Sequence, residues 1–151
     1  MKIVRAAPAD ADELKAICIA GTAYWGYPAE WMARWTERLR ITPEYVERSV
    51  TYKAVDDGTI IAWYALVHGW RKSLLDHLWV TPPRIGTGVG RALFHHALDQ
   101  ARRAGSSYLE LEADPHAVGF YEHMGARQVK TVMGAMHREI PVMVIDLEEA
   151  S

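Results

Sequence analysis

The sequence contains little that indicates a secreted, membrane-spanning or nucleic-acid-binding protein. It has one cysteine in 151 residues, so no disulfide can form within the chain. Its longest apolar run, residues 60–67, is far too short to span a bilayer, and a formal net charge of −2 gives no basic surface for nucleic acid. Acidic residues at positions 10, 12 and 13 stand where a signal peptide would be apolar. We therefore expect a cytoplasmic protein with neither a membrane nor a nucleic-acid partner.

The composition is that of a globular domain with a core. Hydrophobic residues make up 50% of the chain and charged residues 24%, which excludes disorder. The length favours a single domain over residues 1–151. Cys18 shares one helical face with Leu14, Ile17 and Gly21, so we expect it to pack in the core and not to act as a nucleophile.

Apolar periodicity and turn residues predict alternating strands and helices. Strands are expected at 2–6, 51–56, 59–67, 74–80, 108–113, 127–132 and 140–147, and helices at 10–20, 28–40, 88–104 and 116–124, with a short one starting at Thr42 and Pro43. Asp10 and Glu13 resemble a capping box at the first helix. The order predicts an α/β (α+β) domain with a mixed, largely antiparallel sheet flanked by helices.

The most informative segment is the loop between residues 80 and 91. Glycines at 86, 88 and 90 follow an apolar strand and lead directly into a helix. Backbone N–H groups in such a loop can point at an anion, and the helix N-terminus adds about half a positive charge. The loop therefore predicts a phosphate or diphosphate site.

The spacing of the glycines excludes two common nucleotide motifs. A dinucleotide fingerprint starting at Gly86 needs a glycine at Arg91, and one starting at Gly88 needs a glycine at Leu93. A P-loop starting at Gly86 needs glycine and lysine where the chain has Arg91 and Ala92. The segment L-W-V-T-P-P-R-I-G-T-G-V-G resembles instead the coenzyme A diphosphate loop of the GNAT superfamily of N-acetyltransferases.

A second segment, D-P-H-A-V-G-F-Y-E-H-M-G-A at 114–126, is similar to the family's N-x-x-A-x-x-F-Y-x-x-x-G-F motif. The two motifs and the elements between them cover residues 74–126. Two positions depart from the family pattern, because Ile85 replaces a polar residue before the first glycine and Asp114 replaces asparagine. The resemblance implies a GNAT-like fold and transfer of an acetyl group from acetyl-CoA to a primary amine of a small molecule or peptide, by direct attack in a ternary complex.

The resemblance also implies a set of site residues. The cofactor-binding positions are Leu78, Trp79, Val80, Ile85, Gly86, Thr87, Gly88, Val89, Gly90, Arg91, Asp114, Ala117 and Tyr121. The Tyr121 hydroxyl is expected to protonate the departing thiolate, since a phenol can donate to a thiolate at moderate cost.

The general base and the acceptor site stay open at this point. Asp76 and His77 lie on the strand before the loop and are expected on opposite faces. Either could deprotonate the amine, as could Glu112 or a water chain, but an ion pair or a packed histidine explains them equally well.

An aromatic cluster follows the first helix. Tyr24, Trp25, Tyr27 and Trp31, with Glu112, are the candidate acceptor-binding residues, although two helices burying their seam would give the same pattern. The seven histidines show no metal-ligand spacing, so no metal is expected. A non-catalytic acetyl-CoA sensor is the alternative function, and a homodimer remains open.

Overall fold

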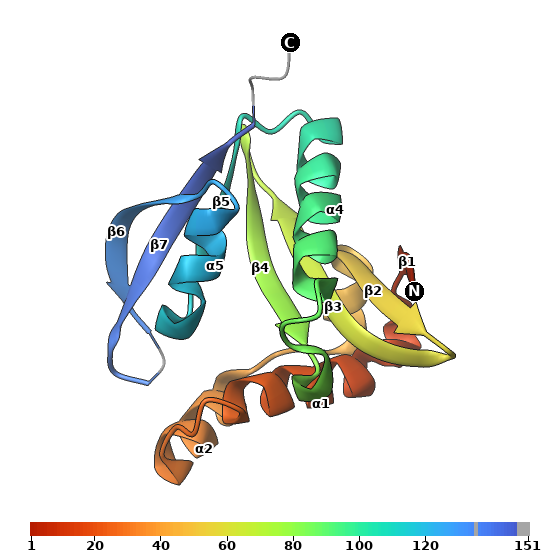
Figure 1. Ribbon diagram of the computed structural model, residues 1–151, viewed down its shortest axis with the longest axis vertical. Helices are drawn as coiled ribbons and strands as arrows, with labels where there is room; N and C mark the ends of the chain where they lie inside the picture. The colour runs from red at the N-terminus through yellow and green to blue at the C-terminus, as the bar shows by residue number, and fades with distance from the viewer. Residues whose placement is uncertain (135, 148–151) are drawn as a thin grey trace.

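A computed structural model describes residues 1–134 and 136–147 of the chain (Figure 1). Its elements in chain order are β1 (Lys2–Arg5), α1 (Ala11–Ala23), α2 (Ala29–Arg38), α3 (Pro43–Arg48), β2 (Val50–Asp56), β3 (Thr59–His68), β4 (Lys72–Val80), α4 (Val89–Arg103), β5 (Tyr108–Glu112), α5 (Val118–His123), β6 (Arg127–Met133) and β7 (Glu139–Asp146). Short 3-10 turns precede α1, α4 and α5 at Pro8–Asp10, Pro82–Arg84 and Pro115–Ala117.

The strands within the described ranges form one seven-stranded sheet in the order β1-β2-β3-β4-β5-β7-β6. Every neighbouring pair is antiparallel except β4 and β5, which α4 connects and which run parallel. The predicted mixed, largely antiparallel sheet flanked by helices is therefore confirmed. The connection through α4 follows the general rule that parallel neighbours need a long crossover.

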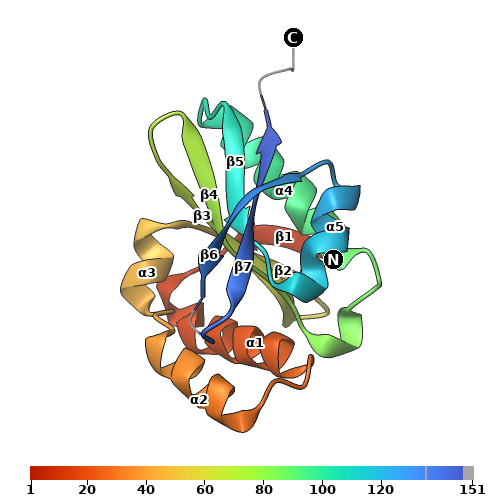
Figure 2. The same cartoon turned by 90° about the vertical axis from the view of Figure 1, so that its left-hand side faces the viewer.

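Helices cover both faces of the sheet. Figure 2 shows α4 and α5 to the right and α3 to the left of the central strands. The apolar stripe of α4 is buried against the sheet and comprises Leu93, Phe94, Ala97, Leu98 and Ala101. A second core on the opposite face holds Leu14 and Cys18 of α1 together with Trp63 of β3. Cys18 is fully buried, as predicted, and burial raises the pKa of its thiol.

Differences from the predicted elements lie at element ends, and the strand ends differ by no more than two residues. α1 continues to Ala23, and α2 is shorter than 28–40 and buries none of its residues. The predicted helix at 116–124 begins with a 3-10 turn, and its α-helical part is Val118–His123.

The predicted side-chain cap by Asp10 is wrong. Asp10 already has helical backbone angles, and its Oδ2 accepts instead from the Ala7 N–H and the Lys53 ammonium, each at 2.8 Å. The side chain thus closes the preceding 3-10 turn and ties it to β2. By contrast, Thr42 does cap α3, because its Oγ1 accepts from the Tyr45 N–H at 3.1 Å.

Candidate acetyl-transfer site

The candidate site lies where β4 and β5 separate. Their parallel pairing spans only Lys72–Leu75 and Tyr108–Leu111, while β4 continues for five further residues beside β3. A cavity of about 480 Å³ opens beyond the last pair. Figure 1 shows β4 leading into the glycine loop and α4 on one side, with β5 and α5 on the other.

Most of the predicted site residues meet at this cavity. Those that line it are Trp25, Asp76, His77, Leu78, Trp79, Val80, Ile85, Gly86, Gly88, Gly90, Arg91, Glu112, Asp114, Ala117 and Tyr121. The predicted residues that lie outside its lining are Tyr24, Tyr27, Trp31, Thr87 and Val89. Cys18 does not line the cavity either.

The glycine loop presents free backbone donors beside the cavity. Gly86 and Gly88 adopt φ angles of 81° and 91°, which L side chains rarely adopt, and a Cβ at either position would meet open space. In the described chain, the N–H groups of Gly86 and Gly88 and the first three N–H groups of α4, at residues 89–91, have no backbone acceptor. The Thr87 N–H is not available, because it donates to the Arg84 carbonyl at 3.3 Å.

The loop also carries two cationic side chains. Arg84 and Arg91 line the cavity. Arg84 is held by a 2.9 Å ion pair with Asp56 at the end of β2. The free N–H groups, the two guanidinium groups and the α4 dipole make this end of the cavity attractive to a diphosphate.

A β-bulge changes the expected orientation of Asp76 and His77. Ala65 of β3 pairs with His77 and Leu66 pairs with Leu75, so Asp76 is an extra residue in β4. The prediction that the two side chains point to opposite faces is wrong, because a bulge breaks the alternation of the strand. Both contact Tyr45 of α3: its hydroxyl donates to Asp76 Oδ2 at 2.5 Å, and its ring lies edge-on to the His77 imidazole at 5.8 Å.

His77 is held in an aromatic environment that opposes protonation. Its Nδ1 accepts from the Trp79 indole N–H at 2.9 Å, and its ring lies 5.0 Å from that of Trp63. Burial lowers the pKa of His77 below its ordinary value, an effect that the charge of Asp76 only partly opposes. With Nδ1 occupied as an acceptor, neutral His77 carries its proton on Nε2 and has no free lone pair with which to act as a base.

Tyr121 lies on α5 with only 8% of its surface exposed. Its ring packs edge-on against Phe94 and Phe120 at 5.6 and 5.1 Å, and the residue lines the cavity. Burial, with a smaller effect of Asp114, raises the pKa of the phenol, so the hydroxyl stays protonated and able to donate. Phe120 is partly buried against the same core and also lines the cavity.

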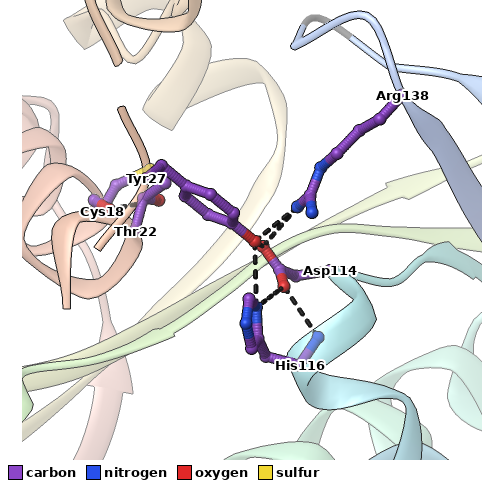
Figure 3. A network of polar contacts seen from close by, with 6 residues as sticks. All are labelled: Cys18, Thr22, Tyr27, Asp114, His116 and Arg138. Carbon is purple, nitrogen blue, oxygen red and sulfur yellow. Dashed lines mark hydrogen bonds and ion pairs between the residues drawn. The ribbon is translucent and has the colours of Figure 1, made fainter. Parts of the chain in front are cut away.

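A polar network closes the cavity beside α5 (Figure 3). The Tyr27 hydroxyl lies 2.6 Å from Asp114 Oδ2 and 3.0 Å from His116 Nδ1, and a guanidinium nitrogen of Arg138 donates to the Tyr27 oxygen. The Trp25 ring stacks on the imidazole of His116 at 4.5 Å. Tyr27 therefore contacts the site through its hydrogen bond to Asp114, although it does not line the cavity.

Sequence reasoning did not identify Tyr45, His116 or Arg138. Tyr45 and Arg138 come from segments far from both motifs, and no local pattern marks them. His116 does follow Asp114 by two residues, the spacing at which an Asp side chain accepts from the backbone, as its Oδ1 does here at 2.9 Å. The Asp-x-His spacing is therefore the local pattern from which His116 could have been predicted.

Among residues 1–134 and 136–147, no group of three or more His, Cys, Asp or Glu side chains is arranged to hold a metal ion. In the same part of the chain, no helix combines the length and apolar character needed to cross a bilayer.

Comparison with known proteins identifies the family. Residues 16–126 match the model of the acetyltransferase (GNAT) family, which is well over half of the chain. The chain therefore belongs to this family and is an acetyltransferase, as predicted. No curated protein sequence matches it significantly.

Solved structures share the fold at low sequence identity. The PaiA N-acetyltransferase of Thermoplasma acidophilum, in complex with coenzyme A, has a TM-score of 0.83 at 17% identity over 96% of this chain and 98% of that one. The putative acetyltransferase yncA of Salmonella typhimurium, with acetyl-CoA, has a TM-score of 0.77 at 16% identity over 100% and 96%. An aminoglycoside 6′-N-acetyltransferase with coenzyme A has a TM-score of 0.74 at 16% identity over 100% and 99%.

The environment of His77 makes a prediction about acid stability. Because folding lowers the pKa of His77 below the ordinary value of about 6.5, the unfolded chain binds an extra proton as the pH falls below that value. The free energy of unfolding should therefore decrease on acidification from about pH 6.5. His77→Gln, which keeps an acceptor for Trp79, should weaken that decrease, as measured by urea unfolding at several pH values.

His123→Gln is the matched control, because His123 is exposed on α5. Its pH dependence should equal that of the wild type. An unchanged pH dependence in His77→Gln would contradict the neutral, buried assignment of His77.

Proposed function

We propose that this chain transfers the acetyl group of acetyl-CoA to a primary amine by direct attack in a ternary complex. The observation that carries the proposal is the arrangement of charge along one cavity. Free N–H groups and two arginines lie at the glycine loop, whereas Asp76 and Glu112 lie where the strands separate. Asp76 and Val80 are four residue steps apart in extended β4, so the acidic end and the glycine-loop end of the cavity are separated by about 13 Å. An anionic cofactor and a cationic acceptor can therefore occupy the same cavity.

The diphosphate of the cofactor would bind the N–H groups of Gly86 and Gly88 and of the first turn of α4. Each charge-assisted hydrogen bond of this kind contributes about 1.5–3 kcal/mol. The pantetheine would run along the inner edge of Leu78–Val80, which has β3 on its other side and no strand on this one. Ala117 lines the opposite wall. The structures of related fold solved with coenzyme A or acetyl-CoA support this choice of cofactor.

The acceptor would bind where β4 and β5 separate. Asp76 and Glu112 each follow the last paired residues of their strands, Leu75 and Leu111. An ammonium group has three donors, and two carboxylates can accept them together. Asp76 Oδ2 is occupied by the Tyr45 hydroxyl, so its other oxygen would contact the amine. A cavity of this size suits a small-molecule amine or the amine-bearing end of a peptide.

The chemistry needs no covalent enzyme intermediate. Cys18 is buried away from the cavity and its raised pKa keeps it a thiol, so it does not serve as an acyl carrier. The amine would attack the thioester carbonyl directly, and the leaving sulfur would take a proton from the Tyr121 hydroxyl. The buried phenol remains protonated until that charge develops.

Cofactor binding at the glycine loop can be tested by thermal unfolding. Acetyl-CoA should raise the melting temperature, because a ligand held by the folded state adds about 2.7 kcal/mol of stability at a hundredfold excess over its Kd. Gly88→Asp should abolish that rise, because it places a bulky negative group at the diphosphate site.

The control is Gly58→Asp in the turn between β2 and β3. Gly58 also has a positive φ, 77°, with open space around its Cα, so the substitution causes comparable backbone strain away from the cavity. It should keep the full response to acetyl-CoA. An equal response in Gly88→Asp would show that the loop does not hold the diphosphate.

The role of Tyr121 can be tested at a single atom. Tyr121→Phe removes the hydroxyl and keeps the ring, so acetyl-CoA binding and folding should hardly change. Turnover, followed as release of free thiol, should fall by about 10²–10⁴-fold in kcat, the usual contribution of a positioned general acid.

The matched control is Tyr64→Phe. Tyr64 is fully buried and its hydroxyl contacts His96 outside the cavity, so this variant should retain wild-type kcat. Wild-type kcat in Tyr121→Phe would rule out the acid role.

A further inference from the structure

The cavity contains a second histidine whose hydrogen bonding is the reverse of that of His77. His116 lies in the turn Pro115–Ala117 between β5 and α5, and 39% of its side chain is exposed. Its Nδ1 lies 2.8 Å from Asp114 Oδ1, and the residue lines the cavity. His77 instead accepts from Trp79 through Nδ1. In both rings Nδ1 is engaged and Nε2 is the remaining nitrogen, so the protonation of Nε2 depends on whether Nδ1 accepts or donates.

The hydrogen-bond donors around Asp114 determine the tautomer of His116. The guanidinium of Arg138 can only donate, and it donates to the Tyr27 oxygen. Burial and the Asp114 carboxylate raise the pKa of Tyr27 to about 12, so Tyr27 keeps its proton and donates it to Asp114 Oδ2 at 2.6 Å. Asp114 Oδ1 accepts from the His116 backbone N–H at 2.9 Å, and because a carboxylate oxygen can only accept, its 2.8 Å contact with Nδ1 is a hydrogen bond in which Nδ1 carries the proton. Nε2 of neutral His116 therefore carries a free lone pair.

The surroundings of His116 hold its ring in place. Asp114 is the carboxylate in direct contact, and Arg138 lies 3.4 Å from Asp114 on the side of the β6–β7 loop. Tyr27 of the α1–α2 loop is neutral, and Trp25 from the same loop stacks on the imidazole face. Glu112, which precedes Asp114 by two residues, adds a second negative charge on the cavity wall. A carboxylate at Nδ1 that orients an imidazole is the geometry of an acid–base dyad.

We infer that His116, oriented by Asp114, is the general base that deprotonates the acceptor amine. This assignment rests on the proposed acetyl transfer and adds a catalytic residue to it. His116 Nε2 takes one proton from the ammonium, and the free amine then forms the C–N bond to the thioester carbonyl. The C–S bond breaks, and the sulfur takes the Tyr121 proton. Tyr121 regains a proton from the new amide nitrogen, and His116 releases its proton to water.

His116→Asn separates the base from the structural contact. An asparagine amide can still donate to Asp114, but it cannot accept the proton of an ammonium. At pH 7 we expect kcat/KM to fall by about 10²–10⁴-fold with the Kd for acetyl-CoA unchanged. The difference in kcat/KM between His116→Asn and the wild type should shrink as the pH approaches about 10, because the amine then loses its proton to the solvent without a general base. His123→Asn, on the exposed side of α5, should follow the wild-type profile at every pH.

Asp114→Asn provides a second variant that keeps the shape of the side chain. An amide has one acceptor oxygen and one NH₂ donor, so it cannot accept from both Tyr27 and the His116 ring, and kcat/KM at pH 7 should fall because the ring is no longer oriented. A loss of kcat/KM in His116→Asn that is equal at all pH values, or wild-type kcat/KM in Asp114→Asn, would overturn the assignment. Wild-type protein that releases no thiol with any amine at any pH would instead overturn the proposed function itself. The two failures are therefore distinguishable.

Discussion

The separation of β4 from β5 is the constraint on which the rest of the site depends. Backbone hydrogen bonds join the two strands only up to Leu75 and Leu111, because β5 ends at Glu112 while β4 continues beside β3 to Val80. A strand edge that loses its partner leaves N–H and C=O groups that a ligand can bind. The same separation opens the cavity and places the glycine loop at the far end of β4. One interruption of the sheet thus opens the cavity in which we propose that both the cofactor and the acceptor bind.

The β-bulge at Asp76 gives this interruption its chemical character. It turns both Asp76 and His77 toward Tyr45, so a carboxylate faces the cavity while the neighbouring imidazole is fixed by Trp79. His116 is fixed in the opposite sense by Asp114. The two histidines of this cavity therefore differ in tautomer, because Nδ1 accepts in His77 and donates in His116. The neighbour of each ring decides its role, and the residue type alone does not.

Features governed by local sequence could be predicted, and features governed by tertiary partners could not. The α4 stripe from Leu93 to Ala101 follows the helical period, and the spacing of Gly86, Gly88 and Gly90 predicts a loop with free backbone N–H groups, so both features were accessible from the sequence. The orientation of Asp76 depends on an inserted residue in the β3–β4 register, which strict alternation does not anticipate. Arg138 reaches Tyr27 across 111 positions of sequence, and no local pattern encodes that contact. The Asp10 carboxylate likewise pairs with the Lys53 ammonium and does not cap α1.

The most direct measurement of this account is an amide chemical-shift titration of isotope-labelled protein with coenzyme A. We expect the largest chemical-shift changes at the amides of Gly86, Gly88 and residues 89–91, followed by those of Leu78–Val80 on the open edge of β4. Amides of β1 and β2, which pair with each other at the far edge of the sheet, should hardly move. Shifts that are largest elsewhere and leave the glycine loop unchanged would contradict the central claim that the separated strands and their loop form the cofactor site.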